Sequence, residues 1–214
     1  VNAFDETDGD DTLLGRSHQG EVVLKRYLKP ALVKLNPNLP EDVYDLAIKE
    51  ITKDRSTLGL VRANKEIYEL IKGGVKVSYQ NSDGEHTTER IKVINWQVPE
   101  ENSFLLVSQL WINGDMYRRR ADLVGFINGI PFLFIELKAS DKPVYNAFHD
   151  NLRDYKDTIP HIFWYNAFVI LSNGRDAKVG SITAPWEHFA DWKKINSEGE
   201  EGIVSLDTMI KGTC

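Results

Sequence analysis

The sequence predicts a mixed α/β protein in which helices flank a central mixed β-sheet and a helical segment precedes it. Apolar residues first recur at helical spacing, over 20–35, 41–52 and 60–71. From Val75 onward, short apolar runs of strand length replace them, and a strand, a helix and a second strand follow one another over 131–171. The chain has 214 residues, of which 42% are hydrophobic and 27% charged, so it can bury one sizeable core.

The N-terminal part divides into an acidic start and a helical segment. Residues 1–19 are expected to form a flexible lead-in, because aspartate and glutamate dominate their beginning. Residues 20–59 hold the first two expected helices, which Pro37 and Pro40 separate. The main domain, 60–214, begins with the third helix.

The main domain is expected to contain the sheet. Its apolar runs predict strands over 75–79, 91–96, 104–112, 121–127, 131–138 and 163–171. Turn signals at 81–84 and 128–129 predict hairpins, the second being an Asn-Gly pair. A helix over 143–160 would join the last two strands in a right-handed parallel crossover, and a final helix is expected over 186–195.

Composition excludes several classes of function. The net charge of -6 is the opposite of a free-standing nucleic-acid binder, although partners can deliver DNA to an enzyme. No apolar run reaches the length of a membrane span and no signal peptide is evident, so a cytoplasmic protein without a membrane partner is expected. The single cysteine, Cys214, excludes an internal disulfide, and the histidines lack zinc-site spacing. No phosphate-binding loop motif occurs, so ATP hydrolysis is not expected here.

A charged tripeptide closes the most apolar strand. Glu136 and Lys138 follow four apolar residues and, being two positions apart on a strand, share a face. If the hairpin turn has three residues centred on Gly129, Asp122 lies opposite Glu136; a two-residue turn displaces this pairing by one. Two carboxylates side by side are unfavourable unless a cation lies between them.

This pattern suits a divalent cation and the hydrolysis of a phosphodiester. Mg²⁺ prefers one or two carboxylates, here Asp122 and Glu136, with the Leu137 carbonyl as a further ligand, and Mn²⁺ is expected to substitute. Lys138 would orient or help to deprotonate the attacking water and stabilise charge on phosphorus. The alternative is an exposed ion pair at a strand end, the usual role of so short a pattern. The apolar strand, the hairpin and the matched aspartate favour catalysis.

These residues resemble the catalytic core of the PD-(D/E)xK nuclease superfamily. The stretch 120–138 is more closely similar to the N-terminal nuclease domain of the R (restriction) subunit of type I restriction endonucleases. The resemblance implies a restriction-endonuclease-like core in which Asp122, Glu136 and Lys138 are catalytic. It implies a Mg²⁺-dependent endodeoxyribonuclease that cuts duplex DNA without reading its sequence. Ala121 stands where the superfamily name has proline, a position that is commonly relaxed.

The resemblance also implies a larger restriction complex. Members of the family continue into an ATP-driven translocase, and this chain stops about where that motor would begin. It is therefore expected to be a fragment that uses ATP only through the absent motor domains. The implied partners are DNA and the methylation and specificity subunits, which choose the site. No small-molecule substrate is expected for the fragment.

Five further residues are candidates for DNA binding or active-site support. The family's Gln-x-x-x-Tyr motif corresponds to Asn151 and Tyr155, which lie four residues apart on one helical face. Asparagine is one methylene shorter than glutamine, so a solvated helix position is the alternative for Asn151, and a core position for Tyr155. Arg118, Arg119 and Arg120 precede the Asp strand and would contact phosphate, or else form a solvated basic run.

Two other functions fit the same residues. A repair or recombination nuclease of this fold would be distinguished by cutting of branched or single-stranded DNA by the isolated chain. A non-catalytic docking module would retain the nuclease core only as a scaffold. In that case Glu136→Ala or Lys138→Ala would leave DNA cleavage by the full complex intact.

Overall fold

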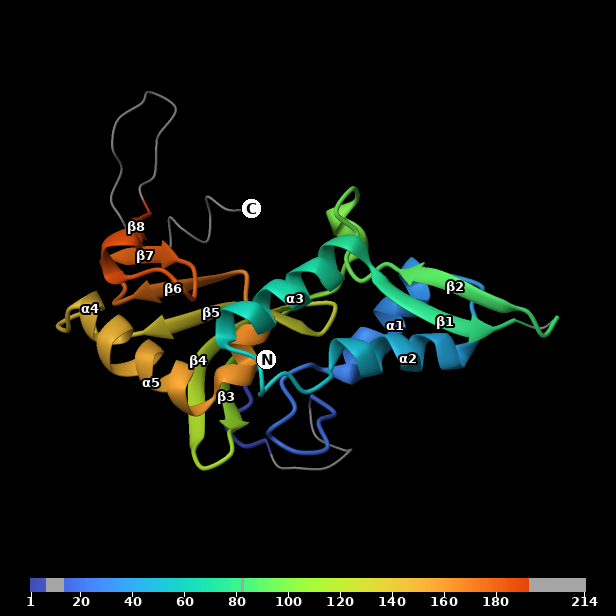
Figure 1. The fold of residues 1–214 in the computed structure, drawn as a ribbon. Coiled ribbons are helices and arrows are strands. Elements are labelled where there is room, and N and C mark those ends of the chain that lie inside the picture. Colours follow the sequence, from blue (N-terminus) through green and yellow to red (C-terminus); the bar gives the residue numbers. More distant parts are fainter. Residues whose placement is uncertain (7–13, 82, 193–214) are drawn as a thin grey trace, which may run out of the picture.

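The computed structural model describes residues 1–6, 14–81 and 83–192. Figure 1 shows a six-stranded sheet with helices on one side and, beside it, a helical part that carries a separate two-stranded ribbon. In the described part of the chain, no helix is both long and apolar enough to cross a membrane.

Three helices form the first half, as predicted: α1 (Lys25–Leu35), α2 (Glu41–Ile51) and α3 (Leu60–Gly73). Each buries an apolar stripe; in α1 this consists of Leu28, Ala31 and Leu32. Gly74 follows α3 with φ of 80°, a left-handed conformation that glycine adopts without strain, and it turns the chain into the next strand.

An antiparallel ribbon follows α3, made of β1 (Val75–Gln80) and β2 (His86–Ile91). The antiparallel pairing of β1 with β2 confirms the predicted hairpin, and residue 82 of the predicted turn 81–84 lies outside the described ranges. The strand predicted over 91–96 is wrong, because β2 ends at Ile91. Most β2 side chains are polar and exposed, so no apolar pattern marks this strand in the sequence. The strand forms through its backbone hydrogen bonds to β1.

The main sheet has the order β3-β4-β5-β6-β7-β8, and every pair except β5–β6 is antiparallel. The strands are β3 (Phe104–Asn113), β4 (Arg118–Ile127), β5 (Ile130–Leu137), β6 (Phe168–Ser172), β7 (Ala177–Gly180) and β8 (Ala190–Asp191). A short 3₁₀ turn, η1 (Pro99–Glu101), precedes β3. The mixed sheet with flanking helices confirms the predicted fold class.

The parallel pair confirms the predicted crossover from β5 to β6. The connection is helical throughout most of its length, running through α4 (Val144–Asn146), the π-helical turn η2 (Ala147–Leu152), α5 (Arg153–Thr158) and the 3₁₀ helix η3 (Pro160–Trp164). The strand predicted from residue 163 begins only at Phe168. The intervening aromatic residues turn into the core as η3 instead, where Phe163 and Trp164 are buried.

The helix predicted over 186–195 is wrong in its described part. The chain forms a 3₁₀ turn, η4 (Trp186–His188), and then pairs with β7 as β8. The helix is expected because aromatic residues recur every three positions, at Trp186, Phe189 and Trp192. A 3₁₀ turn has three residues per turn and so accommodates the same spacing, and the rings of Trp186 and Phe189 stack. Residues 193–195 lie outside the described ranges.

Residues 1–6 and 14–19, which are expected to belong to a flexible lead-in, pack against the domain instead. Asn2 forms a parallel bridge to Ser108 on the edge of β3, and Arg16 is buried with an ion pair to Glu6. A buried arginine needs such a partner, and the pair ties the N-terminal segment to the domain. Residues 7–13 of the lead-in lie outside the described ranges.

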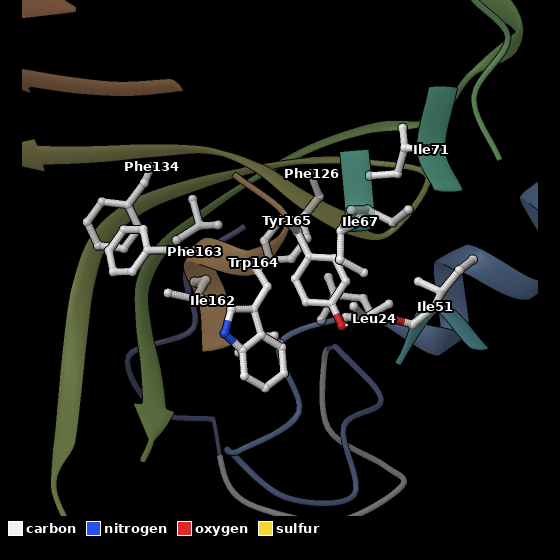
Figure 2. Packing of buried hydrophobic residues seen from close by; sticks show 14 of the residues in the cluster. Leu24, Ile51, Ile67, Ile71, Phe126, Phe134, Ile162, Phe163, Trp164 and Tyr165 are labelled. Atoms are coloured by element: carbon white, nitrogen blue, oxygen red, sulfur yellow. Dashed lines mark hydrogen bonds between the residues drawn. The ribbon is translucent and has the colours of Figure 1, made fainter. Parts of the chain in front are cut away.

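One hydrophobic core joins the helices to the sheet (Figure 2). The rings of Phe134 on β5 and Phe163 pack with centroids 4.9 Å apart. Tyr165 reaches across the core and donates its hydroxyl to the carbonyl of Ile51 at 3.0 Å. Residues before and after position 60 share this core, so the N-terminal helices support the sheet that carries the candidate site.

Candidate active site

The β4–β5 hairpin brings Asp122 and Glu136 to one end of the sheet. Leu123 pairs with Ile135, next to both acidic residues, as the sequence predicts. The turn, however, has two residues, which alone would displace the pairing by one position. A register shift after Gly125 leaves one extra residue in β5, and this brings the positions of Asp122 and Glu136 back opposite each other.

Asp122 lies at an interruption in the pairing of β3 with β4. Its Oδ2 accepts a hydrogen bond from the backbone N–H of Leu137 at 2.9 Å, which ties it to the end of β5. On the other side, Gln109 of β3 is unpaired and has φ of 56°. Left-handed backbone at a residue other than glycine is strained, and such strain concentrates at functional sites. Sequence reasoning missed Gln109, because no side-chain pattern marks a kink inside a strand.

Glu136 is a buried carboxylate with incomplete hydrogen bonding. Its residue is only 2% exposed, and its Oε1 accepts from the Tyr155 hydroxyl at 3.4 Å. The Lys138 ammonium lies 3.9 Å from the same oxygen, whereas Oε2 has no partner. Burial, and then the charge of Asp122, raise the pKa of Glu136 from its usual 4.5 to about 8. The site therefore holds a buried carboxyl group that has one oxygen without a partner and lies beside a second carboxylate.

A network on the crossover helix holds Lys138 in place. The Lys138 ammonium donates a short hydrogen bond to Asn151 Oδ1, and Asn151 Nδ2 donates to the Tyr155 hydroxyl at 3.5 Å. The same hydroxyl lies 3.2 Å from the Arg120 carbonyl. Burial raises the pKa of Tyr155, so this hydroxyl stays protonated. Asn151 belongs to the π-helical turn η2, a distortion that is frequent at functional sites.

The structure thus gathers five of the sequence-predicted residues at one end of β5: Asp122, Glu136, Lys138, Asn151 and Tyr155. Leu137 is the last residue of β5 and lies between Glu136 and Lys138. Its backbone N–H is held by Asp122.

The three arginines are not brought together. Arg119 forms an ion pair with Asp154 of α5, with Nη2 and Oδ1 2.9 Å apart, and this pair lowers the pKa of Asp154. Arg118 and Arg120 are exposed and lie over the ring of Trp111, 4.1 and 5.4 Å from its centroid. Strand alternation explains the separation, since residues two apart share a face. Two of the three guanidinium groups therefore remain accessible.

The residues present fit a magnesium-type cation. Glu136 Oε2 is a buried oxygen without a partner beside a second carboxylate, and oxygen ligands of this kind are those that Mg²⁺ prefers. Among the described residues, no group of three or more His, Cys, Asp or Glu side chains could hold a metal. A cation here would depend on two carboxylates together with backbone, water or phosphate oxygens, which is the usual Mg²⁺ arrangement.

The mixed sheet and the helices that flank it are compatible with a restriction-endonuclease-like fold. The family model of the type I restriction enzyme R protein N terminus matches residues 3–188. The chain therefore belongs to this family.

Two relatives illustrate the family. The chain is 34% identical, over 87% of its length, to the type I restriction enzyme HindI endonuclease subunit of Haemophilus influenzae. It is 31% identical, over 89% of its length, to a protein of Methanocaldococcus jannaschii provisionally named as the type I restriction enzyme MjaIXP endonuclease subunit. In each case the match covers 18% of the relative, so the chain corresponds to a small part of these proteins.

Proposed function

We propose that this chain is the nuclease part of a type I restriction enzyme endonuclease subunit and hydrolyses phosphodiester bonds of duplex DNA with Mg²⁺, for which Mn²⁺ can substitute. The observation that carries the proposal is Glu136, a buried carboxylate with one unpartnered oxygen beside Asp122 and Lys138. Keeping such a buried carboxyl group ionised costs several kcal/mol, by general estimates. A site that retains it is explained by a cation that binds there.

Asp122, Glu136 and the Leu137 carbonyl are the proposed ligands of that cation. When bound, it would lower the pKa of a water molecule and neutralise charge on the phosphate. The same ligands explain why the two carboxylates sit next to each other at the end of β4 and β5, an arrangement that is otherwise unfavourable.

Lys138 is the proposed catalytic side chain that supplies a positive charge in addition to the metal ion. Its ammonium is held between Glu136 and Asn151, so it is oriented before substrate arrives. There it would position the attacking water, whose oxygen bonds to phosphorus while the bond from phosphorus to the leaving oxygen breaks. It would also stabilise the negative charge that gathers on the phosphoryl oxygens. Asn151 and Tyr155 act as positioning residues for Lys138 and Glu136.

DNA delivery and site choice belong, in this proposal, to other parts of the enzyme. The chain carries a net charge of -6 and has no phosphate-binding loop motif, which supports dependence on an ATP-driven translocase and on methylation and specificity subunits. Arg118 and Arg120, which have no carboxylate partner among the described residues, are the proposed phosphate contacts next to the site. Such a complex would act on DNA in the cytoplasm.

The decisive test uses the full-length subunit assembled with its methylation and specificity subunits. We expect Glu136→Ala and Lys138→Ala to abolish plasmid cleavage while ATP hydrolysis continues. The matched controls are Glu100→Ala and Lys142→Ala, exposed residues outside the network, which should cleave normally. Normal cleavage by the Glu136 and Lys138 variants would instead identify a docking scaffold. Faster cutting of branched or single-stranded DNA by the isolated chain would identify a repair nuclease.

A calorimetric titration of Mn²⁺ tests the metal site without any partner subunit. Wild-type chain should bind Mn²⁺, and Glu136→Ala should not, because one of two carboxylate ligands is lost. The Glu100→Ala control should bind as wild type does. Equal binding by wild type and Glu136→Ala would place the ion elsewhere.

A further inference from the structure

Four clustered cations lie on the exposed face of the β1–β2 ribbon and at its base, and we call them the ribbon cluster: Lys72, Lys76, Arg90 and Lys92. Lys76 and Arg90 are directly opposite each other in the antiparallel register. Lys72 lies at the end of α3 that enters β1, and Lys92 follows β2. All four are exposed. The cluster is a local positive surface on a chain whose net charge is -6.

No carboxylate compensates this cluster within the described part of the chain. None of the four forms an ion pair there: Lys72 lies over the Tyr68 ring at 5.4 Å, and Arg90 donates to the Gly73 carbonyl at 3.3 Å. Glu89, the acidic neighbour on β2, pairs with Val77 and so belongs to the opposite face of the ribbon. Like charges directly opposite across strands are unfavourable. The Lys76–Arg90 pair is therefore not explained by the stability of the ribbon.

A groove of about 300 Å³ lies beneath three of these cations. Lys72, Arg90 and Lys92 line it, together with the backbone of Gly73 and Gly74 and with the side chain of Trp96. Trp96 is 54% exposed, which is unusual for so large an apolar side chain. The groove thus offers cations at its rim, which suit the phosphates of a nucleic-acid backbone.

We propose that the ribbon cluster binds the backbone phosphates of duplex DNA without reading sequence, as a second contact remote from the catalytic site. The inference rests on the proposed function for its substrate, DNA. A two-stranded ribbon has the width that a major groove admits, and exposed lysines and arginines supply the sequence-independent part of DNA affinity. Figure 1 shows the ribbon and the end of β5 on opposite sides of the molecule. The contact would therefore raise affinity and leave the chemical step unchanged.

The test is binding of a fluorescently labelled duplex, without a recognition site, to the chain in EDTA, measured by anisotropy from about 50 to about 200 mM salt. The variant is Arg90→Gln combined with Lys92→Gln. The matched control is Lys25→Gln combined with Lys29→Gln, which removes the same charge from the exposed Lys25 and the half-buried Lys29, both of which already have carboxylate partners.

We expect the ribbon variant to bind about tenfold more weakly at the lowest salt and to lose about two from the slope of log affinity against log salt. The control should stay within about twofold of wild type, and the charge-keeping variant Arg90→Lys with Lys92→Arg should bind normally. Equal affinities for the ribbon variant and its control, or no binding by wild type, would overturn the proposal. If the ribbon variant and its control bind DNA equally well, the partner of the ribbon cluster would be an acidic protein surface instead.

Thermal unfolding provides a second readout. Because Arg90 faces Lys76, the Arg90→Gln substitution should leave the melting temperature unchanged or raise it while it weakens DNA binding. A structural role would instead lower the melting temperature. Since the binding assay contains no metal, it is independent of cleavage. Normal cleavage by Glu136→Ala would refute the nuclease proposal and leave the binding result standing.

Discussion

The two ends of the β4–β5 hairpin each bury a polar residue, and the two residues differ in how completely they are bonded. At the turn, Asn128 is fully buried, and its amide donates to the Val93 carbonyl at 2.8 Å and to Asn102 Oδ1 at 2.9 Å. Its own Oδ1 accepts from the Ser103 N–H at 2.7 Å. At the other end, Glu136 is equally buried but charged when ionised, and its Oε2 has no partner.

The difference separates a group that stabilises the fold from a group that is kept for a ligand. A buried neutral amide with all its bonds made contributes stability and fixes one conformation. A buried carboxylate with a neighbouring carboxylate and an orphan oxygen lowers stability until something positive binds. The two ends of one hairpin therefore follow opposite rules, and substitutions at each end should have opposite effects.

The largest expected effect is on cleavage, from Glu136→Gln. The amide keeps the shape of the side chain but cannot serve as a charged ligand, so we expect cleavage by the assembled enzyme to fall by about a thousandfold or more, equal to about 4 kcal/mol of transition-state stabilisation. The same variant should melt several degrees higher than wild type in EDTA at neutral pH, because the wild-type chain must either take up a proton at Glu136 or bury its charge when it folds. A variant that is both inactive and less stable would contradict this account.

The pH dependence of stability sharpens the same prediction. In the fold, the pKa of Glu136 is about 8, compared with 4.5 for an ordinary glutamate. Between these values the unfolded chain has lost the proton and the folded chain retains it, so this residue makes metal-free stability fall as pH rises from about 4.5 to 8. Glu136→Gln should lack this decline, which denaturant unfolding in EDTA at several pH values would measure.

At the turn, the expected effect is on stability and not on cleavage. Asn128→Ala removes three hydrogen bonds and puts alanine at φ of 52°, where asparagine is better tolerated, so we expect a loss of about 2 to 4 kcal/mol in the free energy of unfolding. Asn128→Gly tolerates the left-handed backbone and should lose less. Folded enzyme of either variant should cleave at the wild-type rate; a loss of specific activity would mean that the two ends are coupled.

The sequence predicts the β4–β5 hairpin and the position of its two carboxylates, but not the length of the turn or the register shift. The Asn-Gly signal and the spacing from Asp122 to Glu136 correctly placed the two carboxylates side by side. The reason was different from the one assumed, since a two-residue turn and a register shift after Gly125 replace a three-residue turn. The kink at Gln109 could not be predicted, because no side-chain pattern marks an interruption in the pairing of β3 with β4.

Elsewhere, tertiary pairing overrode local pattern. β2 is polar along most of its length and forms through its backbone bonds to β1, whereas the apolar residues that follow it enter the core as a loop. Residues 190–191 complete the sheet edge instead of extending a helix. The burial of Arg16 depends on Glu6, a partner ten residues away in the sequence that composition alone cannot assign.

The smallest expected effect comes from Asn151, the residue that stands where the family motif has glutamine. Its Oδ1 accepts from Lys138, so Asn151→Ala should free the ammonium and lower the cleavage rate by about tenfold, or about 1.4 kcal/mol. Mn²⁺ affinity should hardly change, because Asn151 is not among the proposed ligands. Asp150→Ala, an exposed neighbour on the same helical turn, is the matched control and should cleave normally.

Asn151→Gln distinguishes a positioning role from a merely structural one. The longer amide can still reach Lys138, so this variant should retain most of the cleavage that Asn151→Ala loses, with the same melting temperature in all three proteins. Equal losses in both variants would show that the π-helical turn requires asparagine itself. No loss in either would mean that Glu136 alone holds Lys138 well enough for catalysis, since its Oε1 already lies 3.9 Å from the ammonium.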